Sequence, residues 1–72
     1  MDERQLTVLQ MLLDGQSVRS IIREWGQMME IFAESINEAL FDEIGDTAVE
    51  CDGEDITLIE DYREDIERLM GR

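Results

Sequence analysis

The sequence predicts a small α+β domain made of three helices, a β-hairpin and a closing helix. Apolar residues recur with the 3.6-residue period of helices up to about residue 44, then alternate with period two, and then return to helical spacing. The chain has 72 residues, of which 43% are apolar. This length and composition allow one folded domain with a small core.

The first helix is expected over residues 3–13. Asp2 can cap it, and Gln5 stands at the position that completes a capping box. An Asp-Gly pair at 14–15 ends it. The predicted apolar stripe comprises Leu6, Leu9, Leu12 and Leu13.

A second, short helix is expected after Ser17, which can cap it. Its apolar face comprises Val18, Ile21, Ile22 and Trp25. A third helix runs to Ile44, with an apolar pattern of Met28, Met29, Phe32, Ile36 and Leu40. The apolar positions of both segments are nearly in phase, so they could form one continuous helix. Gly26 favours a break between them.

After a Gly-Asp stop at 45–46, two strands are predicted over residues 47–51 and 56–60. Asp61 is expected to cap a closing helix over residues 62–70, paired with Glu64 in a capping box. Its inward-facing residues are predicted to be Ile66, Leu69 and Met70.

The register of the hairpin depends on its turn. A two-residue turn at 52–53 would set Glu50 opposite Asp55, and like charges facing each other destabilise a strand pair. A four-residue loop over 52–55 instead pairs apolar residues, Cys51 with Ile56 and Val49 with Leu58. We therefore favour the four-residue loop, which gathers four apolar side chains on one face.

Helices followed by a hairpin wing are the order of a winged-helix domain, in which the third helix usually reads DNA. The charge opposes that function here. Asp and Glu number 19 against six Arg, the net charge is −13, and twelve of the acids lie between residues 27 and 61, where no base occurs. Such a chain repels phosphate and anionic membranes and attracts cations or basic proteins. Nucleic-acid binding is therefore the alternative that the charge of the chain opposes.

The sequence also lacks the side chains that catalysis commonly needs. It contains no His, no Ser-His or Cys-His pair and no Gly-rich phosphate loop. Cys51 is the only cysteine, so no internal disulfide can form, and we interpret it as a small apolar strand residue. The longest uncharged run, residues 5–13, is too short to span a membrane. We expect a non-enzymatic domain in a reducing cytoplasm, with no direct membrane insertion.

The predicted third helix carries an acidic residue every fourth position: Glu30, Glu34, Glu38 and Asp42. This spacing aligns them in one ridge along the helix. The ridge could dock a basic protein surface, on a partner or on other domains of the parent chain, or it could be a solvated face without a partner.

A divalent cation is the alternative ligand. Carboxylates that could supply oxygen ligands lie at Asp46, Glu50, Asp52, Glu54 and Asp55. Their spacing does not match a calcium-binding loop. Asn37, a polar residue on the helix that carries Ile36 and Leu40, could instead bond the hairpin backbone and fix it against the helix.

Several motifs resemble one family. These are Ile36-Asn37-Glu38, Gly45-Asp46, Glu50-x-Asp52-Gly53 and Asp61-Tyr62, within a longer run of acidic and apolar residues that starts at Met28. Together they resemble the C-terminal domain of tellurite-resistance TerB-type proteins, over nearly the whole chain.

The resemblance implies that residues 1–72 form a single domain taken from a longer bacterial protein, in which it would follow other TerB-type modules. Such proteins belong to systems linked to stress, metal or phage response. The family's polar and acidic positions have been proposed to bind a metal. They correspond here to Glu34, Asn37, Glu38, Asp46, Glu50 and Asp52.

Overall fold

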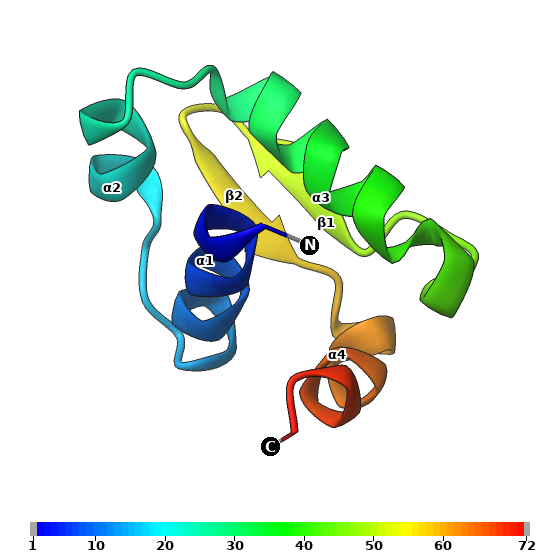
Figure 1. Cartoon of the computed structure of the whole chain (residues 1–72). Coiled ribbons are helices and arrows are strands. Elements are labelled where there is room, and N and C mark those ends of the chain that lie inside the picture. The colour runs from blue at the N-terminus through cyan, green and yellow to red at the C-terminus, as the bar shows by residue number, and fades with distance from the viewer. Residues whose placement is uncertain (1, 72) are drawn as a thin grey trace.

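The structure, a computed structural model, describes residues 2–71. Its elements are α1 (Glu3–Leu13), α2 (Arg19–Glu24), α3 (Met29–Ile44), β1 (Val49–Asp52), β2 (Asp55–Leu58), a 3₁₀ turn η1 (Glu60–Tyr62) and α4 (Arg63–Leu69). The predicted α+β order of three helices, a hairpin and a closing helix is confirmed (Figure 1).

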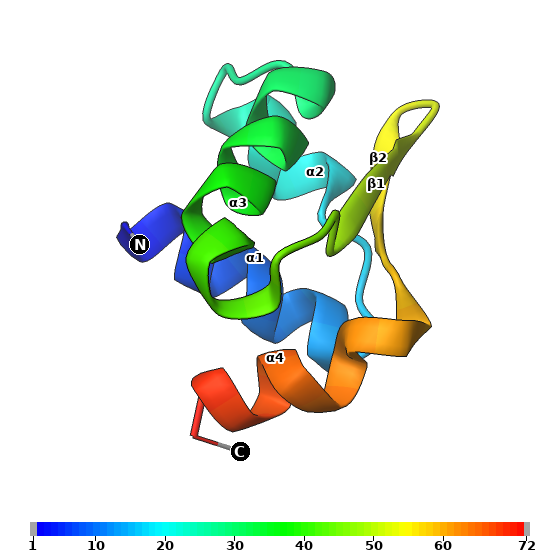
Figure 2. The ribbon, with the colours of Figure 1, turned by 90° about the vertical axis from the view of Figure 1, so that its right-hand side faces the viewer.

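The hairpin lies between helices. α3 packs along β1, and α1 packs against β2 (Figure 1). Viewed from the side, α1 lies between α3 and α4 (Figure 2). The buried apolar core comprises Val8, Leu9, Leu12, Leu13, Val18, Ile22, Phe32, Ala33, Ile36, Leu40, Ala48, Val49, Ile56 and Ile66. Within residues 2–71, no helix has the length and apolar character needed to cross a membrane.

The start of α1 is as the sequence predicts. The Asp2 carboxylate accepts the backbone N–H of Gln5 at 2.8 Å, and the Asp2 N–H donates to the Gln5 side chain at 3.1 Å. The predicted stripe is wrong at Leu6, which is 38% exposed, while Val8 is fully buried. The buried face of α1 is formed by Gln5, Val8, Leu9, Leu12 and Leu13. Leu6 lies at the edge of this face.

α2 and α3 are separate helices, as Gly26 favours. Gly26 follows the last turn of α2 with φ +70°, a left-handed conformation that glycine adopts without strain. The chain then enters α3 through Met28, whose backbone is extended. Met28 therefore lies outside α3 and is 65% exposed, so its predicted place in the apolar pattern of this helix is wrong.

The prediction that Ser17 caps α2 is also wrong. The residue before the helix is Val18, whose apolar side chain has no acceptor for a capping bond and is fully buried in the core. The Ser17 hydroxyl accepts the Arg19 N–H at 3.4 Å and donates to Asp55 at 2.7 Å. Its main partner is thus the hairpin.

The favoured hairpin register is confirmed: Val49 lies opposite Leu58 and Cys51 opposite Ile56. Both strands lie one or two residues closer to the turn than the predicted ranges 47–51 and 56–60. The ladder continues to Asp52 opposite Asp55, so the turn contains two residues and not four. This like-charge pair is tolerated because Asp55 has its own hydrogen-bond donors.

The start of the closing helix differs from the prediction. One residue, Ile59, joins β2 to η1. Asp61 lies inside this 3₁₀ turn and does not cap α4, which begins at Arg63 without a side-chain cap. Ile66 is fully buried, but Leu69 is 46% exposed, contrary to the prediction. Met70, the residue after this seven-residue helix, is partly buried and packs against the core, as predicted.

Candidate interaction site on the third helix

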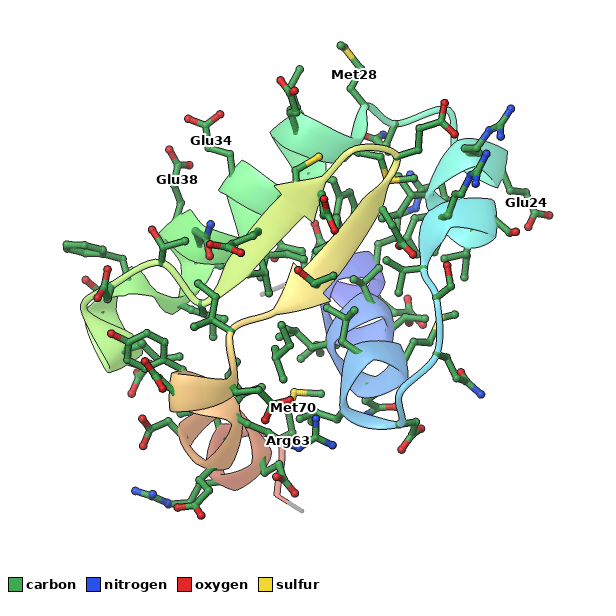
Figure 3. All side chains as sticks on the ribbon, turned by 180° about the vertical axis from the view of Figure 1, so that it is seen from behind. Glu24, Met28, Glu34, Glu38, Arg63 and Met70 are labelled. Atoms are coloured by element: carbon green, nitrogen blue, oxygen red, sulfur yellow. The ribbon has the colours of Figure 1, made fainter. Side chains whose placement is uncertain are left out.

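The four predicted ridge residues lie together on the exposed side of α3. Its opposite side is buried through Phe32, Ala33, Ile36 and Leu40, which fixes the helix rotation. The ridge comprises Glu30, Glu34, Glu38 and Asp42, all of which are exposed. Figure 3 shows Glu34 and Glu38 projecting from α3 into solvent.

The ridge has no cationic partner in the part of the chain that the structure describes. The ion pairs found there join Arg19 to Glu54, Arg63 to Glu60 and Glu67, and Arg68 to Asp65. All of them lie on α2, the hairpin tip, η1 or α4. The carboxylates of the ridge therefore remain uncompensated.

Two large apolar side chains share this face, and the sequence did not predict their role. Ile31 is 55% exposed and Phe41 is 60% exposed. At 100° per residue, both project within the arc occupied by the ridge. Their signal in the sequence is that they fall out of phase with the buried stripe. The exposed face of α3 is thus acidic and also presents two exposed apolar side chains.

Asn37 fixes β1 against α3, as the sequence suggested. Its side-chain oxygen accepts the N–H groups of Ala48 at 2.9 Å and Val49 at 3.0 Å. Its amide nitrogen donates to the Val49 carbonyl at 3.0 Å. These groups lie on the edge of β1 that no strand pairs. The amide oxygen accepts two hydrogen bonds and the amide nitrogen donates one, so Asn37 has a structural role.

Asp46 links the end of α3 to the closing segment. The Tyr62 hydroxyl donates to its carboxylate at 2.6 Å, and the Thr47 N–H donates at 2.7 Å. Both bonds favour the ionised form and lower the pKa of Asp46, the Tyr62 bond most. The same bond raises the pKa of Tyr62, with burial and nearby acids adding to the rise.

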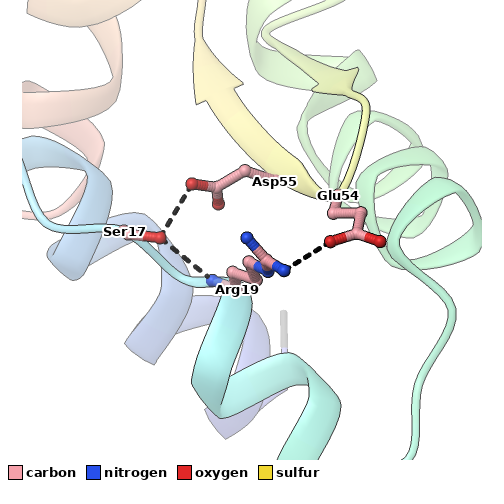
Figure 4. Close-up of polar contacts among 4 residues, drawn as sticks. All are labelled: Ser17, Arg19, Glu54 and Asp55. Carbon is pink, nitrogen blue, oxygen red and sulfur yellow. Dashed lines mark hydrogen bonds and ion pairs between the residues drawn. The ribbon is translucent and has the colours of Figure 1, made fainter.

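The hairpin tip is fastened to the start of α2. Ser17 donates to Asp55, and Arg19 forms an ion pair with Glu54 (Figure 4). Burial raises the pKa of Asp55, but the bonds from Ser17 and from backbone N–H groups, with the charge of Arg19, outweigh it, so the pKa is lowered. Together with Asp46, three of the predicted cation-binding carboxylates therefore already have protein partners.

The predicted metal residues are divided between two hollows beside α3. One, of about 560 Å³, is lined by Glu34, Asn37, Glu50 and Asp52 among others. The other, of about 500 Å³, is lined by Glu34, Asn37, Glu38 and Asp46 among others. Across residues 2–71 no three Asp, Glu, Cys or His side chains are arranged to hold one ion. The metal hypothesis stays a prediction.

Cys51 lies on β1, as interpreted from the sequence. It is half-buried and packs against the core, and its Sγ lies 3.5 Å from the Gly53 carbonyl oxygen.

No curated protein and no solved structure matches this chain. The sequence model of the TerB-C domain matches residues 1–67, and this range contains α1, α2, α3, the hairpin and most of α4. The family resemblance carried by the motifs of α3 and the hairpin is therefore confirmed, and the chain belongs to the TerB-C domain family.

Proposed function

We propose that this TerB-C domain is a non-catalytic interaction module of a bacterial protein of the tellurite-resistance type, and that the exposed face of α3 docks a basic protein surface. One observation carries the proposal. The carboxylates of the ridge have no ion pair among residues 2–71 and lie beside two exposed apolar side chains.

The negative charge of the α3 face determines that the partner surface is positively charged. A face with four uncompensated carboxylates in a chain of net charge −13 attracts Lys- and Arg-rich surfaces and repels acidic ones. Ile31 and Phe41 would add apolar contacts with the partner, which the carboxylates of the ridge cannot make. The partner surface is therefore basic with apolar residues between its charges, on another protein or on another domain of the parent chain.

The position of the face supports the same function. α3 is held by its buried stripe and by the three bonds of Asn37 to the hairpin, so the ridge stands on a rigid support. A preformed surface loses little conformational entropy on binding.

The proposal is tested by NMR on the ¹⁵N-labelled domain with a helical peptide of Lys and Leu as the probe. The matched control peptide carries Glu in place of each Lys. We expect saturable amide shifts along α3 between Glu30 and Asp42 with the Lys peptide, and none with the Glu peptide. Raising the salt from about 0.05 M to about 0.5 M should weaken binding strongly, because screening acts on exposed charges. Shifts spread evenly over all acidic segments, or binding insensitive to salt, would overturn the proposal.

A further inference from the structure

A second surface lies on the side of the molecule formed by α1, α3 and α4. It is a hollow of about 330 Å³ with a buried apolar floor that includes Leu9, Leu40 and Ile66. Two of the five large exposed apolar side chains among the described residues, Leu6 and Leu69, line it at 38% and 46% exposure. The face of α3 that enters it is not the face that carries the ridge.

We infer that this hollow binds a short helical segment of a partner protein, which inserts two aliphatic side chains and places a basic residue beside Glu43. The inference does not depend on the ridge. It assigns a separate, mainly apolar contact to the domain.

The lining favours a peptide segment over a small polar metabolite. A polar ligand is oriented in its site by a few precisely placed polar groups. Here Glu43 is the one charged residue in the lining, and the other side chains are Leu, Ile, Ala or Met. An open apolar hollow between helices is instead the form that receives the aliphatic face of a helix, with anchors one turn apart.

The carboxylate of Glu43 favours a partner segment that carries a basic residue. Glu43 has no ion pair in the described part of the chain, and it also lines a small adjoining hollow with Asp65 and Arg68. Arg68 pairs with Asp65 at 3.3 Å, so the carboxylate of Glu43 is left for a Lys or Arg of the partner. A second copy of this chain is disfavoured because each copy carries −13.

The test uses methyl-labelled protein and a blocked helical peptide with two Leu one turn apart and a single Lys. We expect saturable shifts of the methyl groups of Leu6, Leu69 and Met70. A peptide with Gln in place of both Leu should give no such shifts. Glu43→Gln should weaken binding about two- to fivefold, as loss of one exposed charge pair does.

Two groove variants separate binding from folding. Leu69→Ser removes apolar surface at the rim, and Ala39→Phe adds a side chain that fills the hollow; each should weaken binding at least about fivefold. Ala39 is exposed, so its replacement leaves the core intact, and a dispersed amide spectrum verifies the fold. The variant Glu34→Gln/Glu38→Gln should bind this peptide as the parent does.

Three results would overturn the inference. They are the absence of saturable methyl shifts, shifts confined to the ridge of α3, and groove shifts that follow protein concentration without peptide, which would indicate self-association. The second result would leave the function proposed for the ridge standing, so the two claims fail separately.

Discussion

At the scale of single residues, Asn37 determines where the hairpin sits. One amide satisfies two N–H groups and one carbonyl on the unpaired edge of β1. Backbone groups left without partners away from water are costly. The Asn37 side chain extends from α3 to the backbone at Ala48 and Val49, and its amide can both accept and donate hydrogen bonds there.

Replacing Asn37 with Ala should lower the free energy of unfolding by roughly 3 kcal/mol, because three partly buried backbone groups lose their partner. Urea denaturation followed by Trp25 fluorescence measures this. Glu38→Ala on the same helix is the control and should stay within about 0.5 kcal/mol, since Glu38 is exposed. Equal effects of the two changes would contradict the role assigned to Asn37.

Tyr62 is the only tyrosine, so phenolate absorbance reports on it alone. Its pKa is raised by the bond to Asp46, by burial and by nearby acids, so its titration should have a midpoint above the ordinary value of about 10. A raised pKa in the folded state stabilises the fold below the unfolded value, and this contribution disappears as pH rises through the folded value. Asp46→Asn should move the midpoint back toward the ordinary value. A midpoint that does not respond would show that Asp46 has no such effect.

At the scale of elements, Arg63 joins the closing helix to the first one. Its guanidinium donates to the Leu13 carbonyl at the end of α1 at 2.6 Å and pairs with Glu67 at 3.5 Å. Arg63 is labelled in Figure 3 at the start of α4. The Leu13 carbonyl is one of the groups that a helix leaves unpaired at its end.

Arg63→Met should reduce stability by roughly 2 kcal/mol, the typical effect of losing a hydrogen bond from a charged group. Arg68→Met is the matched control on the same helix. The Arg68 side chain is 75% exposed and pairs only with Asp65 among the described residues, so its loss should change stability by about 0.5 kcal/mol or less. Thermal denaturation of both variants makes the comparison. If the two lost the same stability, the link from α4 to α1 would not be structural.

The features predicted correctly from the sequence are those that depend on local rules. The capping box of α1, the break at Gly26 and the hairpin register follow from short-range geometry and residue pairing. The errors come from tertiary packing. Ser17 bonds Asp55, which is 38 residues away, and does not cap α2.

The same division holds for the candidate site. The four-residue spacing of the ridge was visible in the sequence, because that spacing places residues on one helix face. The exposure of Ile31 and Phe41 was not, because apolar residues are expected inside unless the rotation of the helix is known. The groove could not be predicted either, since three elements far apart in the chain form it.

At the scale of the whole molecule, charge repulsion opposes folding. Twelve acids lie between residues 27 and 61 without a base in that range. Raising the NaCl concentration at pH 7 should therefore raise the melting temperature, because screening weakens repulsion between exposed charges. Calorimetry in about 0.05 M and about 0.5 M NaCl tests this. A fall in melting temperature would mean that the ion pairs outweigh the repulsion.

Lowering the pH should reduce the stability of the fold through two carboxylates, Asp46 and Asp55. Asp46 and Asp55 have lowered pKa values in the folded state, so their contribution to stability is present above the ordinary value of about 3.9 and is lost as pH falls through the folded values. Asp55→Asn should make stability less dependent on pH below about 4 than in the parent domain. Denaturation curves across this range measure it, and an unchanged dependence would contradict the bond network at the hairpin tip.

The whole domain is also expected to attract divalent cations through its net negative charge. Because no three ligands converge on one point within residues 2–71, Mg²⁺ or Ca²⁺ at constant ionic strength should produce only uniform, unsaturated amide shifts. Localised, saturable shifts between Asp46 and Asp55 would instead reveal a specific site.

The central claim is that the ridge of α3 docks a basic surface. The most direct test measures the affinity of the Lys-Leu peptide for two double variants of equal net charge. One is Glu34→Gln/Glu38→Gln on the ridge. The other is Glu24→Gln/Glu64→Gln at exposed positions on α2 and α4. We predict that the ridge variant binds at least about fivefold more weakly than the control variant. Equal affinities would show that only the overall charge attracts the peptide, and would contradict the claim.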